Sequence, residues 1–450
     1  MTKLFGTDGI RSRSGSFPLD EETLRIIGFA LAERLRGSEG EETRFITGRD
    51  TRESGAAIES AIHSGIRAAG GSAVSAGVIT TPGVAFLTSN GRFNAGIVIS
   101  ASHNPFEDNG LKIFLPDGRK LDRESEEFIE QKVDERVSIR EGESEVDDSG
   151  ASALQSKYLQ HFSFDFGLLD LSGLKIIADC ANGAASMLAP LLFRKFGGEI
   201  ITINAEPDGR NINRNCGSLH VDHLRLAVLE SGADIGVAFD GDADRALFID
   251  EEGELLDGDG VLWIMANFLK DREVLKGNKV IATVMSNVGL ELALKEVDVE
   301  LVRTAVGDKY VLDEIVASDA SLGGEQSGHI IFPSRTLVGD GLQTALFVLE
   351  AMTETGRSLS ELRSGFVSFP QILVNVKVSE KVPFEEIQGL NDLVDETERE
   401  LEGSGRLLLR YSGTENLARV MIEGREQSEI EELANRLADH IAAEIGSDDG

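Results

Sequence analysis

The alternation of apolar, strand-like runs with helical patterns constrains the fold of this chain more than any other feature. Apolar residues at helical spacing occupy positions 24, 27, 31 and 35, just before a strand-like run at 44–47. Further strand-like runs lie at 96–100, 175–178, 235–239, 280–284 and 300–303. This alternation predicts α/β layers with mostly parallel sheets, in which ligands sit beyond the carboxyl ends of strands. The loops after these runs are therefore the places to search for chemistry.

The length of 450 residues corresponds to about three or four domains, at roughly 100–200 residues per domain. Polar stretches at 141–152, 250–253 and 363–369 are candidate boundaries. We predict domains at 1–150, 151–252, 253–366 and 367–450. The last domain differs from the others, because its strand-like runs at 372–378, 406–410 and 419–422 precede a closing helix with a capping-box pattern at Ser428 and Glu431.

The composition excludes several classes of protein. Apolar residues make up 41% of the chain, and no run approaches the ~18 residues of a membrane span. The N-terminus lacks a signal-peptide core, and two cysteines make no disulfide framework, so we expect a soluble, cytoplasmic protein. The net charge is −34, from 44 basic and 78 acidic residues, which argues against a nucleic-acid partner.

The basic residues are 14 Lys and 30 Arg. Few lysines beside many carboxylates indicate a halophilic protein, because strong ionic screening relieves the repulsion within a highly charged chain. An ordinary acidic protein is the alternative.

The most informative loop is Asp240-Gly241-Asp242-Ala243-Asp244-Arg245, between two apolar runs. Three carboxylates on alternate residues can converge on one hard cation. An EF-hand loop begins in the same way, but its sixth position needs glycine, and here that position is Arg245. The strand-like flanks also differ from the helices of an EF-hand. The loop therefore favours Mg²⁺ over structural Ca²⁺.

A second loop, Ser100-Ala101-Ser102-His103-Asn104-Pro105, follows the apolar run at 96–99. Ser102 is a candidate nucleophile or phosphate carrier. Adjacent residues of an extended chain point to opposite faces, so we do not expect His103 to pair with Ser102 as in a serine hydrolase. Lys112 follows ten residues later and is predicted to return to the same pocket. A plain Asn-Pro turn is the alternative.

Two further loops and several arginines have the chemistry of a sugar-phosphate site. In residues 323–329, two glycines precede Glu325, Ser327 and His329, which could bind sugar hydroxyls, although a plain turn explains the pattern equally well. In residues 410–416, an arginine, hydroxyls and a glycine could form a nest of donors around a phosphate, although a hairpin turn explains the pattern equally well. Basic residues at other loop positions could hold an anionic substrate; these are Arg11, Arg49, Arg52 and Arg210.

Together these loops resemble those of the α-D-phosphohexomutase family. The likeness runs from GTDGIR at 6–11 to the closing helix, and all four signature loops appear in order. The resemblance implies a four-domain, heart-shaped architecture, with three α/β domains of mixed sheets and a smaller C-terminal α+β domain around a central cleft. It also implies an isomerase that moves phosphate between the 6- and 1-hydroxyls of a sugar through a 1,6-bisphosphate, which also primes the enzyme.

The resemblance assigns roles to individual residues. It implies a phosphoserine at Ser102, with Mg²⁺ bound by Ser102, Asp240, Asp242 and Asp244. Lys112 would be a general acid/base, and Arg11 and Arg245 would assist at the reacting phosphate. The sugar would be bound by Glu325, Ser327 and His329. The distal phosphate would be held by Arg410, Ser412, Gly413 and Thr414.

Within the family, Gln326 and the stretches at 283–287, 303–308 and 369–376 point to a member that acts on glucosamine phosphates. Members acting on mannose or glucose phosphates typically have methionine where this chain has Gln326, and they are the alternative. The chain departs from the family pattern at Asn416, where proline is usual, and at Ser12, where glycine is common. An aspartyl phosphatase using Asp240 and a sugar-phosphate sensor stay open as well, and the predicted assembly is a monomer or homodimer.

Overall fold

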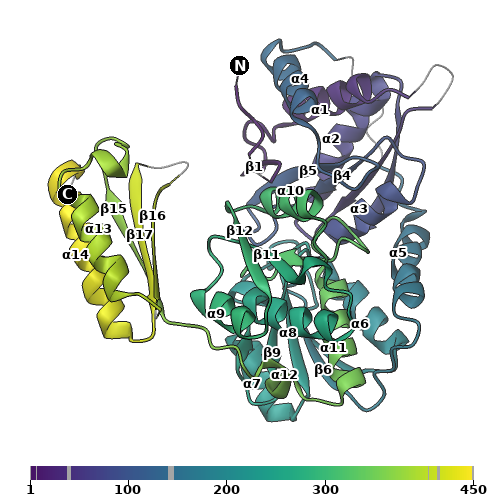
Figure 1. Ribbon diagram of the computed structural model, residues 1–450. Helices are drawn as coiled ribbons and strands as arrows, with labels where there is room; N and C mark the ends of the chain where they lie inside the picture. The colour runs from purple at the N-terminus through teal and green to yellow at the C-terminus, as the bar shows by residue number, and fades with distance from the viewer. Residues whose placement is uncertain are drawn as a thin grey trace. The chain divides into compact units, whose positions relative to one another are not determined.

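The computed structural model describes residues 2–6, 8–37, 42–139, 146–403, 405–412 and 416–447 (Figure 1). The chain forms two compact units: one comprises residues 1–285 and 299–364, and the other comprises residues 286–298 and 365–450. The first unit contains three α/β sheets in succession, and the second contains one antiparallel sheet with its helices.

The first sheet has the strand order β1-β5-β4-β2-β3. Its strands are β1 (Ile10–Arg13), β2 (Arg44–Arg49), β3 (Ser72–Val78), β4 (Ala95–Ile99) and β5 (Asp108–Phe114). The helices of this part of the chain are α1 (Glu21–Arg34), α2 (Gly55–Ala68), α3 (Thr81–Ser89) and α4 (Arg123–Asp134). Every residue of β4 is buried, because this apolar strand lies in the interior of the sheet.

The second sheet has the order β10-β9-β8-β6-β7. Its strands are β6 (Lys175–Asp179), β7 (Glu199–Ile203), β8 (Ile235–Phe239), β9 (Ala246–Asp250) and β10 (Leu255–Leu256). The surrounding helices are α5 (Ala151–Asp165), α6 (Ala185–Lys195), the short 3₁₀ helix η1 (Gly217–Leu219) and α7 (Asp222–Ser231). The central strands β8 and β9 are buried along their whole length.

The third sheet has the order β12-β11-β13-β14. Its strands are β11 (Lys279–Thr283), β12 (Glu300–Thr304), β13 (Gly323–Gly324) and β14 (Ile330–Ile331). The helices of the same unit are α8 (Gly258–Asp271), α10 (Asp308–Ser318), α11 (Gly341–Thr355) and α12 (Leu359–Arg363), whereas α9 (Val288–Glu296) belongs to the second unit.

The fourth sheet is antiparallel, with the order β15-β17-β16. Its elements are β15 (Gln371–Lys377), α13 (Leu390–Glu400), β16 (Gly405–Tyr411), β17 (Leu417–Gly424) and α14 (Gln427–Ile445). Helices α13 and α14 lie side by side along the sheet (Figure 1). Apolar residues at helical spacing in α14 pack against β17, which explains the core of this unit; they include Ile430, Leu433, Leu437 and Ile441.

The three sheets of the first unit share one plan, a parallel centre with an antiparallel edge. β2 pairs parallel with β4, β6 with β8, and β11 with β13. In each case the next strand folds back as an antiparallel hairpin, formed by β4–β5, β8–β9 and β13–β14. The sheets are therefore mixed, and the prediction of mostly parallel sheets holds for their centres only. The loops at the tips of these hairpins carry the candidate site residues.

The predicted strand-like runs coincide closely with β2, β4, β6, β8, β11 and β12. The predicted domain boundaries stay predictions. Within the described ranges, no helix has the length and apolar character that crossing a bilayer requires.

Candidate active site

Ser102 lies in the β4–β5 hairpin and faces the β8–β9 hairpin. Its hydroxyl donates a hydrogen bond of 2.7 Å to Oδ2 of Asp240, and its side chain is buried. Ser102 has a φ of 52°, a left-handed conformation that non-glycine residues rarely adopt. The extended backbone assumed in the argument against a Ser102–His103 hydrolase pair is not present here, because Ser102 is left-handed. His103 Nδ1 lies 3.3 Å from the Ser102 Oγ.

The carboxylates of Asp240, Asp242 and Asp244 converge at the tip of the β8–β9 hairpin. One oxygen from each lies within 4.8 Å of the others, and all three residues are buried. Oδ1 of Asp242 and Oδ1 of Asp244 are buried without a hydrogen-bond partner among the described residues. A divalent metal with oxygen ligands would satisfy these buried acceptors, so the cluster fits such an ion.

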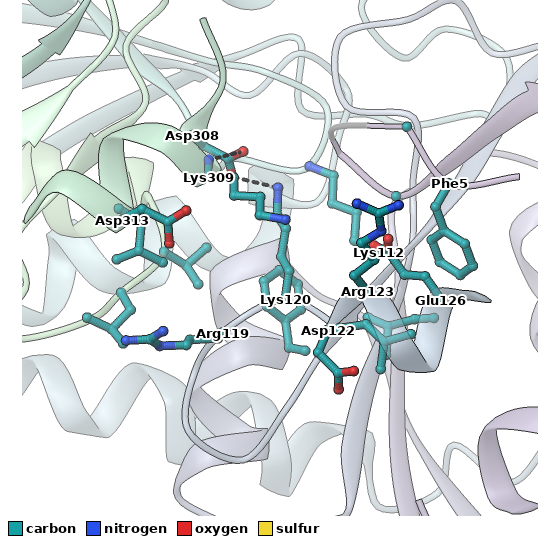
Figure 2. A pocket seen from close by; sticks show the side chains of 18 of the residues that line it. Phe5, Lys112, Arg119, Lys120, Asp122, Arg123, Glu126, Asp308, Lys309 and Asp313 are labelled. Atoms are coloured by element: carbon teal, nitrogen blue, oxygen red, sulfur yellow. Dashed lines mark hydrogen bonds and ion pairs between the residues drawn. The ribbon is translucent and has the colours of Figure 1, made fainter. Parts of the chain in front are cut away.

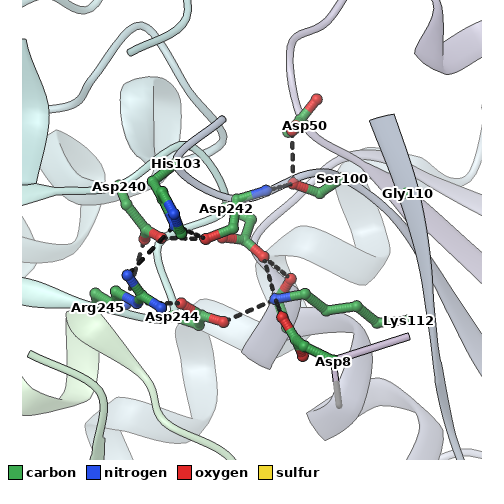
Figure 3. A network of polar contacts seen from close by, with 12 residues as sticks. Asp8, Asp50, Ser100, His103, Gly110, Lys112, Asp240, Asp242, Asp244 and Arg245 are labelled. Atoms are coloured by element: carbon green, nitrogen blue, oxygen red, sulfur yellow. Dashed lines mark hydrogen bonds and ion pairs between the residues drawn. The ribbon is translucent and has the colours of Figure 1, made fainter. Parts of the chain in front are cut away.

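Lys112, on β5, inserts its ammonium among these carboxylates (Figure 3). Nζ lies 3.0 Å from Asp242 Oδ2, 2.9 Å from Asp244 Oδ2 and 3.2 Å from Asp8 Oδ2. Burial opposes the charge on Lys112, but the three carboxylates raise its pKa well above the ordinary value. The same ammonium holds the pKa of Asp244 well below its usual range, against the effect of burial.

The environment of Asp240 shifts its pKa in the direction opposite to that of Asp244. Burial, followed by the charges of Asp244 and Asp242, raises the pKa of Asp240 well above the ordinary value for a carboxyl group. Thr81 supports the neighbouring carboxylate from α3, because its Oγ1 donates a 2.5 Å hydrogen bond to Asp242 Oδ2. The cluster is thus held by side chains from two sheets and one helix N-terminus.

A chain of ion pairs that the sequence did not predict continues from Lys112. Asp8 accepts from Arg11 at 2.5 Å, and Lys120 Nζ lies 2.5 Å from Asp8 Oδ1. Lys120 Nζ also lies 2.6 Å from Asp308 Oδ2 (Figure 2). Lys120 also lines a cavity of about 770 Å³ between the β5–α4 region and α10. Sequence spacing could not predict these ion pairs, because the paired residues lie far apart along the polypeptide. Lys120 and Asp308, for example, are separated by 188 residues.

A second cavity, of about 460 Å³, contains several predicted site residues. Its lining includes both arginines predicted at the reacting phosphate and two of the three predicted sugar-binding residues, namely Arg11, Arg245, Glu325 and His329. Arg245 Nη1 lies 3.3 Å from His103 Nδ1. Burial, followed by the charges of Arg245 and Arg11, lowers the pKa of His103 to about 4.

The β13–β14 hairpin supplies the sugar-loop residues. Glu325 accepts a 3.2 Å hydrogen bond from the Gly307 amide. Nε2 of His329 accepts from the Gly339 amide at 3.1 Å, which leaves the ring proton on Nδ1, 3.8 Å from Asp244 Oδ2. The Ser327 Oγ is buried, and no hydrogen-bond partner for it exists among the described residues.

Three of the four arginines predicted at loop positions form ion pairs with carboxylates and do not line the 460 Å³ cavity. Arg49 pairs with Glu59 at 2.6 Å, and Arg210 pairs with Glu53 at 2.7 Å. Arg52 is buried and pairs with Asp50 at 2.8 Å. Only Arg11 lines the 460 Å³ cavity. Arg11 also pairs with a carboxylate, that of Asp8, so its position in the cavity wall is what distinguishes it from the other three.

The predicted phosphate-binding loop lies in the second unit. Arg410 on β16 stands directly opposite Arg419 on β17, so both side chains leave the same face of the sheet. Arg419 Nη2 lies 3.4 Å from the Ser412 Oγ. Burial and the Arg419 charge lower the pKa of Arg410. Gly413 and Thr414, which the sequence assigned to the same loop, lie outside the described residues.

Comparison with known proteins places these hairpins in a recognised architecture. Four stretches match the phosphoglucomutase/phosphomannomutase domains: domain I at residues 2–140, domain II at 156–253, domain III at 257–368 and the C-terminal domain at 373–440. The chain thus has an α/β fold with a four-domain architecture.

Relatives in sequence cover the whole chain. Phosphoglucosamine mutase from Citrifermentans bemidjiense is 44% identical over 452 residues, which is 100% of this chain and 99% of the relative. The enzyme of the same name from Koribacter versatilis is 45% identical over 452 residues, covering 99% and 97% of the two chains.

Solved structures agree on the fold. A phosphoglucomutase/phosphomannomutase family protein from Burkholderia thailandensis matches with a TM-score of 0.79 and 25% identity, covering 98% of this chain and 97% of its own. N-acetylphosphoglucosamine mutase from Aspergillus fumigatus, solved with GlcNAc-6P and magnesium, matches with a TM-score of 0.65 and 19% identity, covering 99% and 96%. The chain therefore belongs to the phosphoglucomutase/phosphomannomutase family, the α-D-phosphohexomutases that its loops resemble.

Proposed function

We propose that this chain interconverts glucosamine 6-phosphate and glucosamine 1-phosphate, as an intramolecular phosphotransferase of the isomerase class. The phosphate passes through Ser102 and a 1,6-bisphosphate intermediate. The observation that carries the proposal is the contact of the Ser102 Oγ with Asp240, within a buried triad of carboxylates beside a buried lysine. The name shared by full-length relatives at about 44% identity supports glucosamine as the sugar.

We propose Mg²⁺ as the metal, held by Asp240, Asp242, Asp244 and an oxygen of phosphorylated Ser102. The partnerless buried oxygens of Asp242 and Asp244 support this assignment. When bound, the ion supplies positive charge against the negative oxygens of the transferring phosphoryl group. The three aspartates are buried, and Asp240 contacts the Ser102 hydroxyl, so these carboxylates would hold the ion beside the serine.

Lys112 is the proposed general acid/base. Its high pKa makes it an ammonium at neutral pH, which suits donation of a proton to the Ser102 Oγ as the P–O bond to serine breaks. The phosphoryl group passes to the sugar hydroxyl, whose proton is taken up by the neutral Lys112 amine, so that the ammonium is restored. Arg11 and Arg245 are proposed to neutralise charge on the phosphoryl oxygens during transfer.

The sugar and the second phosphate need recognition of their own, because the bisphosphate must turn round before its other phosphate returns to Ser102. Glu325, Ser327 and His329 are proposed to bind the sugar hydroxyls. The distal phosphate is proposed to bind at a donor-rich loop on the second unit, formed by Arg410, Ser412, Gly413 and Thr414. The facing pair Arg410 and Arg419 supports an anion site on that loop.

The substrate is tested by side-by-side kinetics after the enzyme has been primed with glucose 1,6-bisphosphate. We expect kcat/KM to be highest for glucosamine phosphate, with lower values for glucose and mannose phosphates. A preference for mannose or glucose phosphate would select the alternative sugar with the same mechanism. Binding without turnover by the primed enzyme would instead indicate a sensor.

The compartment, assembly and salt preference are proposals as well. Two free cysteines fit a reducing cytoplasm, and the assembly is proposed to be a monomer or homodimer. The net charge of −34 supports halophilic adaptation. Activity and thermal stability are expected to rise with KCl concentration, and optimal activity at low salt would overturn the halophilic assignment.

A further inference from the structure

Arg52 lies beneath the Ser102 loop, and acceptors satisfy all five of its N–H groups. Nε donates to Asp50 Oδ2 at 2.8 Å. Nη2 donates to the carbonyls of Ser102 at 3.0 Å and Asn104 at 2.8 Å. Nη1 donates to the carbonyls of Asp108, at 3.0 Å, and Pro105. A guanidinium has five donors in a fixed planar fork, so this residue fixes the position of four backbone carbonyls at once.

Asn213 contacts the same loop from the second sheet's side of the molecule. It lies in the segment between β7 and η1, and both hydrogens of its Nδ2 are used. One is donated to the Ser102 carbonyl at 2.8 Å and the other to the Asn104 carbonyl at 3.1 Å. These two carbonyls are therefore each held by Arg52 and by Asn213.

A third contact fixes the amide of Ser102, whose N–H donates to the Ser100 Oγ at 2.9 Å. The Ser100 hydroxyl in turn donates to Asp50 Oδ2 at 2.6 Å (Figure 3). Asp50 is the carboxylate that also pairs with Arg52. The backbone of Ser102 is thus held at both its N–H and its C=O, which explains how a serine keeps the left-handed φ of 52°.

We propose that Asn213 is a positioning residue for phosphoryl transfer, acting with Arg52 to hold the Ser102 backbone so that its Oγ faces Asp240. The inference rests on the proposed function. The Asn213 amide joins the serine loop to the part of the chain that carries the aspartates. The loop at residues 240–245, which carries the three aspartates, also packs closely against this contact. A Cβ added to Gly241 would lie 2.5 Å from the Ser102 carbonyl oxygen and 2.9 Å from Asn213 Nδ2. Small shifts of a reacting atom reduce the rate of the chemical step more than they reduce binding.

The chain offers a matched control in Asn215. Asn213 and Asn215 both have left-handed backbones, with φ values of 57° and 54°, and the side chain of Asn215 is exposed. Glycine accepts this conformation without strain, so Asn213→Gly and Asn215→Gly make the same change to the backbone. Asn213→Asp keeps the size of the side chain but presents oxygens to two carbonyl acceptors, which reverses an attraction into a repulsion.

The experiment measures three quantities on full-length wild type and the three variants: kcat and KM for glucosamine phosphate, and hydrogen–deuterium exchange of a peptide spanning residues 100–108. We expect Asn213→Gly to lower kcat by about 10- to 100-fold with little change in KM. Asn213→Asp should lower kcat further. Both should speed exchange in the peptide, while Asn215→Gly should match wild type in all three quantities.

Equal kcat values and equal exchange for Asn213→Gly and Asn215→Gly would overturn the proposal, as would a loss confined to KM. A wild-type kcat indistinguishable from zero on every hexose phosphate would contradict the proposed function instead. In that event the exchange measurement alone tests whether Asn213 holds the Ser102 backbone. Faster exchange in Asn213→Gly would support this role, and unchanged exchange would overturn it.

Discussion

The hydroxyl oxygen of Ser102 lies 2.7 Å from Oδ2 of Asp240, although 138 residues separate them along the chain. The contact joins the tips of two hairpins built on the same plan, in which an antiparallel strand folds back from a parallel centre. A nucleophile-bearing loop and a metal-binding loop are thereby brought together by sheet topology. The predictions below follow from the charges that surround this contact.

Removal of divalent metal is expected to abolish turnover. The buried triad has more negative charge than Lys112 alone neutralises, so a bound cation should also stabilise the fold. Dialysis against EDTA should eliminate activity and lower the melting temperature, and added Mg²⁺ should restore both. Full activity in the EDTA-treated enzyme would contradict the metal assignment. Asp242→Asn, which removes one carboxylate, should weaken Mg²⁺ binding in calorimetry.

Replacement of Lys112 by methionine should destabilise the metal-free protein. The substitution leaves the buried carboxylates of Asp242 and Asp244 without their counter-charge, a loss of about 3–5 kcal/mol for a buried pair. Saturating Mg²⁺ should recover part of this stability but not the lost kcat. Urea unfolding with and without Mg²⁺ measures the effect, with the exposed Lys377→Met as control. Equal urea unfolding midpoints for Lys112→Met and Lys377→Met without Mg²⁺ would refute the predicted destabilisation.

Replacement of Arg410 by alanine should weaken phosphate binding. Arg410 and Arg419 occupy facing positions on neighbouring strands, where two positive charges repel each other unless an anion lies between them. One lost charge-assisted contact corresponds to a rise in KM for glucosamine phosphate of about 10- to 100-fold. The kcat should change less than KM. An unchanged KM would remove Arg410 from substrate binding.

Stability should fall in mild acid because of His63. Burial, followed by the charges of Arg67 and Arg49, lowers the pKa of His63 to about 4, and its side chain is fully buried. The unfolded chain takes up a proton at His63 near pH 6.5, whereas the folded chain takes it up only near pH 4. The contribution of neutral His63 to the free energy of unfolding is therefore complete above about pH 6.5. It is lost as the pH falls to 4, and the loss amounts to about 3 kcal/mol.

Melting temperatures across pH 7 to 4 test this contribution by comparing wild type with His63→Gln. The difference between the two proteins should shrink as the pH falls through this window. His220→Gln, at an exposed histidine, should follow the wild-type profile throughout. A difference that does not vary with pH would show that another group is responsible for the acid sensitivity.

The sequence predicted candidate site residues where a single loop carries a recognisable local pattern. Ser102 and the triad Asp240, Asp242 and Asp244 stand directly after apolar strands, and the end of a strand is a position that a pattern can identify. Lys112 was also expected near the serine, because the chain returns along β5 after a turn. The structure brings these residues into one cluster.

Residues that act through backbone carbonyls could not be predicted in this way. Arg52 was interpreted as a candidate for substrate binding, because a basic residue in a loop has the same sequence signal whether it binds a ligand or its own chain. Its five acceptors become visible only in three dimensions. The contact of His103 with Ser102 was missed for a related reason, since a single left-handed residue changes where the next side chain points.

Peptide mapping of the intact enzyme after incubation with glucose 1,6-bisphosphate tests the central claim most directly. The account predicts one added phosphate, located on Ser102 as an acid-stable ester, and no incorporation in Ser102→Ala. Phosphate on Asp240 as an acid-labile acyl phosphate, or full mutase activity in Ser102→Ala, would contradict it.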